Sequence, residues 1–426
     1  MRFQDIALCA LLICILGIEA FLPTPITNGR WIDVSPTDFS KYSKVRTLVR
    51  HNGELFAGVG ENNFGDADIW RISDVSSEQI AGEDNATKWL ENNKVNVLLS
   101  NEGQLWAGLG EVKGEIWRMK SGRWQPILTH NDPEFGPYHY IYSGAVWSDR
   151  PCFGAQGWAG SNRDTNKGPD ILCFDGKKFN NIDTSHLFEK RNYRNVYSMR
   201  VFNNSLIIGL GNMNPNGKSA LLVQHNDIST TIIGGNNVAN SWGDSDHLLP
   251  LSMAEHHGSL FVSFLKQKKQ ESDGLPIWSF DGQTWTDHDI ADVKIVVPNH
   301  LALNGTELLK SNTLINKIIS YKDHLILLAG GQAGGGNTVW AWNVNKNYLH
   351  LIGGYGVNDS WDEKWPKICN KNADNVYFHE AIKTADHREC TRTTWIYTAE
   401  VIRDELYIGV ARANGYLAKI YKYKPL

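Results

Sequence analysis

A repeated hairpin pattern constrains the fold of this chain more than any other sequence feature. The segment TLVRHNGELFAGVG begins at Thr47, and a close copy, VLLSNEGQLWAGLG, begins at Val97. Weaker copies begin at Gly144, Ser198, Ser252, Lys317 and Ala399. Each copy reads as an apolar run, a turn and a second apolar run, which is typical of a β-hairpin. Such recurrence indicates a repeat architecture in which neighbouring units bury each other's surfaces.

A second hairpin follows the first one in each unit. One alignment position in it holds Trp70, Trp117, Trp278 and Trp340. We expect this column to lie in the core, because large aromatic rings are mostly buried. Four strands per unit, repeated seven times, predict an all-β fold, a seven-bladed β-propeller of four-stranded antiparallel blades. A β-sandwich or two smaller β domains is the alternative.

The two ends of the chain predict how the ring closes. The last unit ends after its third strand, KIYKYK, which begins at Lys419. The segment NGRWIDV at 28–34 resembles the fourth-strand text SGRWQPI at 121–127. We therefore expect the amino-terminal strand to pair into the last blade, because closure removes exposed strand edges. Trp31 would then take the position that Trp124 and Trp285 have in their blades.

A glycine motif recurs between units. The triplets Ile80-Ala-Gly, Ile233-Gly-Gly and Ile352-Gly-Gly are each followed, seven residues after the last glycine, by a tryptophan. These tryptophans are Trp89, Trp242 and Trp361. The text resembles the IGG…SW repeats of secreted extracellular and bacterial β-propellers and, loosely, the double-glycine kelch repeats. The resemblance implies a propeller architecture and matches no specific functional family.

The three tryptophans after the glycine motif are the candidate ligand-binding residues. Connections between a fourth strand and the next first strand emerge on one face of a propeller, where aromatic rings can stack on sugars or on a protein surface. The alternative is that Trp89, Trp242 and Trp361 pack between blades, which their recurrence with the repeat favours.

The amino terminus has the pattern of a secretory leader. Arg2 precedes an apolar run at 6–18, and the small residues Gly17 and Ala20 follow. This pattern predicts a signal peptide at 1–20 and a single secreted, extracellular β-propeller domain at 21–426. An uncleaved anchor is the alternative. No later stretch reaches the ~20 apolar residues of a membrane span, so we expect none.

Four cysteines remain after the leader, and an even number indicates disulfides in an oxidising compartment. Three pairings are possible, and we expect the two local ones, Cys152–Cys173 and Cys369–Cys390. The first would join neighbouring strands of one blade, and the second would staple an insertion at about 362–394. Candidate N-glycosylation sites are Asn85, Asn203, Asn304 and Asn358.

No short catalytic motif is present. The chain has no nucleophile elbow, HExxH helix, P-loop or dinucleotide fingerprint. The insertion contains His379, Glu380, Asp386 and His387, whose chemistry suits a metal or acid–base site but whose spacing matches no metal motif. A solvated loop or short helix is the alternative that we prefer. We accordingly expect no metal and no cofactor, and the sequence identifies no catalytic residue.

Charge and composition narrow the partners. The chain of 426 residues has 42 Lys and Arg against 46 Asp and Glu, a net charge of −4, so nucleic acid is not an expected partner. These observations favour a secreted, non-catalytic propeller that binds an extracellular glycan, protein or matrix component. A secreted hydrolase acting on glycans or phosphoesters from the central-channel face is the alternative, because blades can each contribute one catalytic residue without a linear motif.

Overall fold

The computed structural model defines the fold over most of the chain. It describes residues 26 and 29–425, apart from 43, 61–65, 74–75, 83–88, 90–91, 111–112, 131, 133–137, 158–168, 185, 188–192, 213–217, 227–228, 236–237, 243–246, 267–275, 290–292, 298–313, 331–336, 355–356, 358–393 and 413–417. The predicted signal peptide at 1–20 and nearly all of the predicted insertion at about 362–394 lie outside the described residues.

The strands form where the repeated hairpins predict them. The first unit consists of β2 (Lys44–His51), β3 (Glu54–Gly60), β4 (Asp68–Ile72) and β5 (Ser77–Ala81). The second consists of β6 (Lys94–Asn101), β7 (Gln104–Gly110), β8 (Ile116–Lys120) and β9 (Arg123–Leu128). The third consists of β10 (Tyr138–Trp147), β11 (Arg150–Gly157), β12 (Asp170–Phe174) and β13 (Phe179–Asn181).

The remaining units follow the same order. They are β14 (Asn195–Phe202), β15 (Ser205–Gly211), β16 (Ser219–Asn226) and β17 (Ser229–Gly235); then β18 (His247–His256), β19 (Ser259–Lys266), β20 (Pro276–Phe280) and β21 (Trp285–Asp289). Next come β23 (Leu314–Tyr321), β24 (His324–Gly330), β25 (Thr338–Asn343) and β26 (Tyr348–Gly353). The last are β27 (Thr394–Ile402), β28 (Glu405–Arg412) and β29 (Lys419–Pro425), which β1 (Gly29–Asp33) joins.

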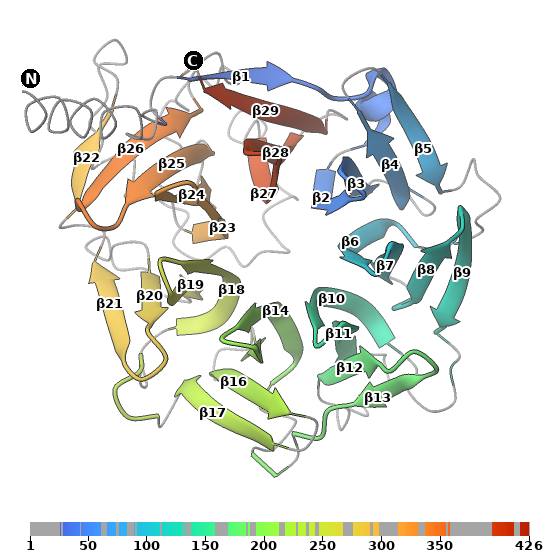
Figure 1. The fold of residues 1–426 in the computed structure, drawn as a ribbon, viewed down its shortest axis with the longest axis horizontal. Helices are drawn as coiled ribbons and strands as arrows, with labels where there is room; N and C mark the ends of the chain where they lie inside the picture. The colour runs from blue at the N-terminus through green and yellow to red at the C-terminus, as the bar shows by residue number, and fades with distance from the viewer. Residues whose placement is uncertain are drawn as a thin grey trace, which may run out of the picture.

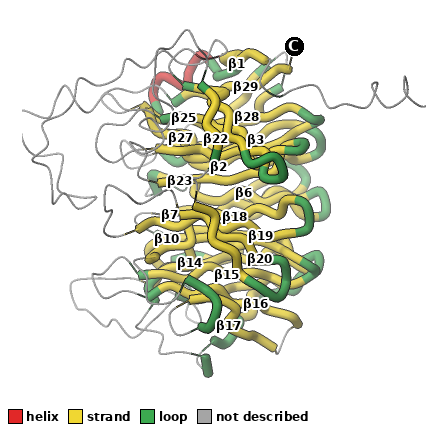
Figure 2. Tube along the Cα trace, turned by 90° about the vertical axis from the view of Figure 1, so that its left-hand side faces the viewer, coloured by secondary structure: helices red, strands yellow, loops and turns green. Residues whose placement is uncertain are grey.

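Tight turns join the first and second strands of each unit. Asn52 has a φ of 50° and Gly53 one of 83°, and Glu102 with Gly103 repeats the pair at 48° and 71°. Two successive residues with positive φ match the right-handed twist of the strands that they connect. Figure 2 shows short turns of this kind, in green, along one side of the molecule.

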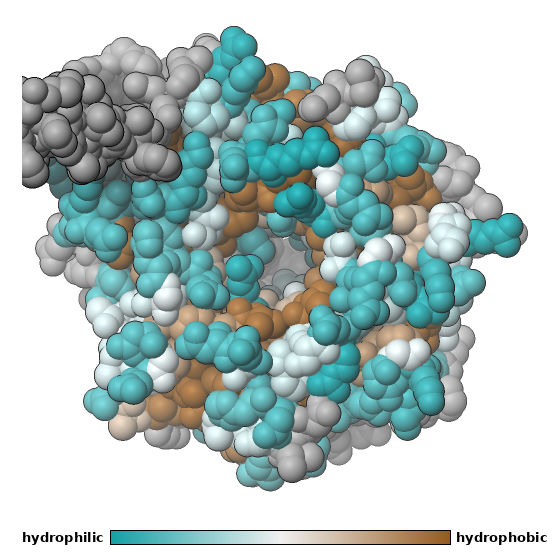
Figure 3. Space-filling model, viewed as in Figure 1, coloured by the Kyte–Doolittle hydropathy of each residue, from teal (hydrophilic) through white to brown (hydrophobic). Residues whose placement is uncertain are grey.

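The units form a ring (Figure 1), and the space-filling view shows an opening at its centre, which we call the channel (Figure 3). Within each unit successive strands are antiparallel neighbours, with the first strand innermost and the fourth outermost, as in β14–β15–β16–β17. This arrangement is a β-propeller, so the prediction of an all-β propeller is confirmed. The core consists of layers between neighbouring units; one cluster, for example, combines Leu328 of β24 with Ile408 of β28.

The first and last strands of the chain are neighbours. β1 pairs antiparallel with β29, from Gly29 opposite Pro425 to Asp33 opposite Tyr421. This is the strand pairing that the sequence predicts. Trp31 is 3% exposed, and its ring centroid lies 5.0 Å from that of Tyr423.

Two elements were not predicted. The short strand β22 (Lys294–Val296) pairs in parallel with β26, the outermost strand of its sheet. Its backbone covers an edge that would otherwise be open, and neighbouring Val293 is buried in the adjacent core cluster. A short 3-10 helix, η1 (Thr37–Lys41), connects β1 to β2 and buries Phe39 against Trp70.

Candidate functional site

Two of the three candidate ligand-binding tryptophans are packed inside the protein. Trp89 is 2% exposed and Trp242 is 4% exposed. The Trp89 indole N–H donates to the Ala67 carbonyl at 2.5 Å, and the Trp242 N–H donates to the Ser219 hydroxyl at 3.0 Å. Rings this enclosed present no face to a ligand, so the structure favours the packing role for both. Trp361 lies outside the described residues.

These two tryptophans fill equivalent junctions between units. The Trp89 ring meets Trp124 of the next unit edge-on at 5.5 Å between centroids. In the same way, the Trp242 ring meets Trp285 of the next unit at 5.2 Å. Edge-to-face contacts of this kind add about 0.5–1.5 kcal/mol beyond the burial of apolar area.

The fourth-strand tryptophans bind the preceding unit in one recurring way. Each indole N–H donates to the backbone carbonyl of the isoleucine that opens a glycine motif. The pairs are Trp31 with Ile352 at 2.7 Å, Trp124 with Ile80 at 3.2 Å and Trp285 with Ile233 at 2.7 Å. Trp31 therefore has the position of Trp124 and Trp285, as the sequence predicts.

In two copies of the glycine motif, at Gly234 and Gly353, a tryptophan ring comes very close to the backbone. A methyl group on Gly234 would lie 2.5 Å from the Trp242 ring, which is shorter than any normal contact. Gly235 has a φ of 135°, a conformation that side chains rarely adopt. The motif thus marks a packing junction, which explains why it recurs with the repeat. The prediction that the recurring tryptophans of the third strands lie in the core is confirmed in part. Trp70 and Trp340 are buried, whereas Trp117 and Trp278 are half-buried.

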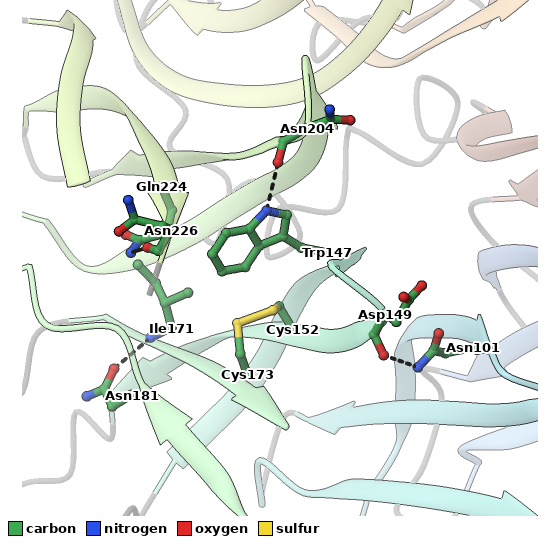
Figure 4. The surroundings of a disulfide bond; sticks show 10 residues. All are labelled: Asn101, Trp147, Asp149, Cys152, Ile171, Cys173, Asn181, Asn204, Gln224 and Asn226. Atoms are coloured by element: carbon green, nitrogen blue, oxygen red, sulfur yellow. Dashed lines mark hydrogen bonds between the residues drawn. A yellow bond between two sulfur atoms is a disulfide. The ribbon is translucent and has the colours of Figure 1, made fainter. Parts of the chain in front are cut away.

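The Cys152–Cys173 disulfide is present (Figure 4). The two residues lie opposite each other on β11 and β12, with their Cα atoms 4.0 Å apart, and both are buried. Beside them the Trp147 indole N–H donates to the Asn204 carbonyl of the next unit at 3.0 Å. The bridge therefore reinforces a layer between two units. The Cys369–Cys390 pair lies outside the described residues.

Only one glycosylation candidate falls within the described ranges. Asn203 is exposed in the turn between β14 and β15, where its φ is 47°. An exposed turn is accessible to modification. Asn85, Asn304 and Asn358 lie outside the described residues, as do His379, Glu380, Asp386 and His387 of the insertion.

A second recurring feature, which the sequence did not reveal, is a β-bulge in every first strand. Each of these strands shifts register against the second strand at the same place, as between Val45 and Thr47 in β2. The residues at the bulge are Arg46, Asn96, Tyr142, Tyr197, Leu251, Asn316 and Tyr397. A bulge redirects the side chain at its centre. Because these residues are three tyrosines, two asparagines, one arginine and one leucine, no single side-chain type marks the position.

Near the bulges, aromatic rings and cations gather at one end of the channel. We name this end, where the first strands begin, the start mouth. Arg46 lies 5.0 Å and Lys44 lies 5.3 Å from the centre of the Tyr397 ring, both within cation–π range. On the neighbouring units Lys94 lies 5.8 Å from the centre of the Tyr140 ring.

A row of tyrosines continues from these cations. The Tyr142 ring centroid lies 6.0 Å from that of Tyr140 and 5.2 Å from that of Tyr197. Tyr142 is 40% exposed, the only large hydrophobic side chain this exposed in the described part of the chain. The tyrosines thus place an accessible ring on an otherwise packed row.

Backbone pairing fixes the spacing around the start mouth. Gly60 pairs with both Lys44 and Lys94, and Gly110 pairs with both Lys94 and Tyr140. Lys44, Lys94 and Tyr140 therefore follow one another at two strand spacings, or about 10 Å. Rigid strands hold this spacing, and a site on strands is positioned more precisely than one on loops.

Charged side chains of separate first strands also influence one another electrostatically. Burial and the charge of Arg200 lower the pKa of Lys317, while Glu400 acts in the opposite direction. Burial raises the pKa of Glu400, and Lys317 opposes that shift. Arg200 lies on β14 and Glu400 on β27, which are not neighbours around the ring, so these side chains interact through the channel. Figure 3 shows the central opening, bordered by both hydrophilic and apolar residues.

Two negative findings concern the described residues alone. Within the ranges given above, no three His, Cys, Asp or Glu side chains are grouped closely enough to hold a metal ion. In the same ranges, no helix has the length and apolar character needed to cross a bilayer.

Comparisons with known proteins agree with the fold. No protein-family model matches the chain, and no curated protein matches its sequence. A GH74 xyloglucanase from Xanthomonas campestris has a similar structure, with a TM-score of 0.53 and 12% identity over 92% of this chain and 53% of that one. This chain thus spans about half the length of the xyloglucanase. The RRP9 WD40 repeats give a TM-score of 0.49 at 9% identity, covering 93% and 98% of the two chains. The WD40 β-propeller domain of Doa1 gives 0.46 at 11% identity, covering 93% and 97%.

Proposed function

We propose that this protein is a secreted, non-catalytic, seven-bladed β-propeller that binds an extracellular glycan, protein or matrix component at its start mouth. The observation that carries the proposal is the tyrosine row, in which exposed Tyr142 lies between Tyr140 and Tyr197. Tyrosine combines a large apolar face with a hydroxyl, which makes it effective in binding sites.

Seven blades and a closed ring complete this proposal. Seven first strands carry the same bulge, and β1 supplies an outer strand to the unit of β27, β28 and β29. The hydrogen bond from Trp31 to Ile352 joins that unit to the one before it. Closure explains why the amino-terminal segment carries a fourth-strand sequence.

Two features that follow the predicted leader support secretion. The buried Cys152–Cys173 bond is of a kind that persists in oxidising compartments. The exposed sequon at Asn203 is accessible to glycosylation there. Cleavage after Ala20 would leave Ile26 near the new terminus, where its carbonyl accepts a hydrogen bond from the Tyr423 hydroxyl.

A hydrolase acting from the channel is the second candidate. Glu400, whose pKa is raised, has the character of a proton donor. Glycoside hydrolysis also needs a second carboxylate about 5–9.5 Å away. Among the described first strands, Glu255 on β18 is the other carboxylate, and it has no observed contact with Glu400.

The experiment is a binding screen of the purified mature protein on glycan and matrix-protein arrays, with a hydrolase panel in parallel. We expect saturable binding that Tyr142→Ala abolishes and no turnover. Array binding that Tyr142→Ala leaves unchanged would contradict the assigned site. Turnover abolished by Glu400→Gln would establish the hydrolase instead.

A further inference from the structure

At several junctions, the residue that ends a first strand forms a hydrogen bond to the next unit. The Trp147 indole N–H, at the end of β10, donates to the Asn204 carbonyl at 3.0 Å. The Tyr321 hydroxyl, at the end of β23, donates to the Asp404 carbonyl at 2.8 Å. Indole and phenol side chains carry no charge at neutral or at acid pH. These two junctions are therefore held in the same way under both conditions.

A histidine takes this position in the fifth unit, which consists of β18 to β21. His256 ends β18, and its Nδ1 lies 2.9 Å from the Ser320 hydroxyl of the sixth unit, β23 to β26. The His256 side chain is buried, and its Nε2 finds no hydrogen-bond partner among the described residues. Protonation would put an N–H donor and a positive charge on this enclosed nitrogen. Because a buried charge without a partner is costly, the closed junction requires a neutral imidazole.

Further histidines surround His256. The His257 ring centroid lies 4.1 Å from that of His256, and His324 on β24 acts electrostatically on the same ring. The Nδ1 of His324 is also buried, with no hydrogen-bond partner in the part of the chain that the structure describes. Beyond it, the Tyr348 ring lies 6.4 Å from His324 and 4.6 Å from His350 between centroids. A proton on one of these histidines therefore makes the next protonation less favourable.

The charged groups near these rings do little to accommodate a proton. Asp323 acts on both His256 and His324 and favours their protonated forms, but it is exposed to solvent. Lys346 opposes protonation of His324, and Glu255, which precedes His256, is exposed. Burial outweighs these effects and lowers the pKa of both histidines from 6.5 to about 4.

The first unit provides a natural comparison, because His51 ends β2 at the equivalent position. Its Nδ1 lies 2.9 Å from the Ser100 hydroxyl of the second unit. Its Nε2 lies 3.1 Å from the side-chain amide of Asn52, which is exposed and can turn its oxygen toward a protonated ring. Burial lowers the pKa of His51, and Glu54 opposes that shift. Both nitrogens of His51 therefore have partners, unlike those of His256.

We infer that the junction between the fifth and sixth units is an acid-sensitive switch, which opens when His256 and His324 take up protons. Each protonated ring must reach water to hydrate its new N–H group, so the contact with Ser320 is lost. Beside it, Phe261 meets Trp342 of the sixth unit at 5.9 Å between centroids, and opening exposes these rings. The junctions held by tryptophan and tyrosine stay closed, so the propeller opens at one place.

The test is hydrogen–deuterium exchange of the purified protein at pH 7 and pH 5, corrected for the effect of pH on intrinsic exchange. The pKa of His256 is about 4 when the junction is closed and 6.5 when the ring is in water, so opening becomes about 30-fold more favourable at pH 5. We expect amides of β18, β19, β23 and β24 to exchange at least that much faster. Amides of β10, β11, β14 and β15, at the junction held by Trp147, should keep their pH 7 rates.

Two sets of variants identify the groups that respond. His256→Gln with His324→Gln keeps neutral polar side chains and should abolish the acceleration at pH 5. His51→Gln removes the equivalent histidine of the first unit and should keep it. Thermal melting at pH 7 checks folding; if the double variant is unfolded, His324→Gln alone, at a half-buried ring, should reduce the acceleration.

Three results would overturn the switch. One is exchange that does not accelerate at pH 5, and another is acceleration that is equal in all units. The third is acceleration that the histidine variants of the fifth and sixth units leave unchanged, or that His51→Gln abolishes.

Discussion

The junctions between units and the start mouth use the same repeat in opposite ways. At three of the junctions equivalent positions carry the same residue: Trp31, Trp124 and Trp285 each donate to an isoleucine carbonyl. At the bulge of the first strands the backbone recurs in every unit, but the side chains are a mixture of tyrosine, asparagine, arginine and leucine. Constant side chains at equivalent positions indicate packing, whereas varied side chains on a constant backbone indicate a surface free to acquire a ligand.

Among substitutions at the junctions between units, Trp31→Ala should lower the stability of the fold the most. Trp31 is 3% exposed and bonded to Ile352, so its loss should cost about 3–5 kcal/mol of unfolding free energy. Denaturant unfolding of the purified protein measures this loss. Trp124→Ala, at the equivalent but half-buried ring, should cost less.

Deleting 28–34 extends the same test to ring closure. We expect poor secretion or aggregation, because the deletion also opens the edge of β29. An unchanged melting temperature would show that β1 is not needed to close the ring.

Removing the disulfide should have the next largest effect. The bond closes a loop with a sequence separation of 21, so Cys152→Ala with Cys173→Ala should lower the unfolding free energy by about 3 kcal/mol. Unfolding of parent and variant under non-reducing conditions compares the two. Identical unfolding curves would show that the disulfide does not stabilise this junction.

Acid should weaken a junction that depends on neutral histidine. His256 is buried with its Nδ1 2.9 Å from the Ser320 hydroxyl of the next unit. Burial, with nearby His257 and His324, lowers its pKa from 6.5 to about 4. Between these values the unfolded chain binds the proton and the folded one does not, so stability falls as pH decreases from about 6.5 to 4.

The full effect of His256 is roughly 3 kcal/mol at the acid end, because one pKa unit corresponds to about 1.4 kcal/mol. Melting temperatures measured from pH 7 to pH 4 test this. His256→Gln should reduce the slope, although His324, whose pKa burial also lowers to about 4, still contributes to it; His225→Gln, at an exposed position, should leave the slope unchanged. A parent profile without slope in this range would rule out the histidine contribution.

Gly234→Ala should have a smaller effect on the same class of junction. The added methyl group would lie 2.5 Å from the Trp242 ring, and overpacking of this kind costs about 1–3 kcal/mol. The chain contains its own comparison, because Ala81 stands at the equivalent position of the first unit, and Ala81→Gly, which removes a buried methyl group, should cost only about 0.5–1 kcal/mol. Calorimetry of both variants compares them. A fully tolerated Gly234→Ala would mean that the ring can move.

The sequence predicted the junctions because local patterns determine them. The hairpin turns, the tryptophan of NGRWIDV and the glycine motif each have a recognisable local sequence. The pairing of β1 with β29 was predicted from the likeness of NGRWIDV to another fourth strand. The sequence left the role of Trp89 and Trp242 open, because the exposure of each ring depends on how the next unit packs against it. The start mouth was not predicted at all. A bulge is a property of strand register, and Lys44, Lys94 and Tyr140 meet only when separate units assemble.

The central claim is that an aromatic ring at a junction is structural and one at the start mouth is not. Parallel thermal melts of Trp242→Ala and Tyr142→Ala test this most directly, because each removes one ring. We expect a loss of about 3–5 kcal/mol for Trp242, which is 4% exposed, and under about 1 kcal/mol for Tyr142, which is 40% exposed. Equal losses from the two substitutions, or a larger loss from Tyr142→Ala, would contradict the division between framework and binding site.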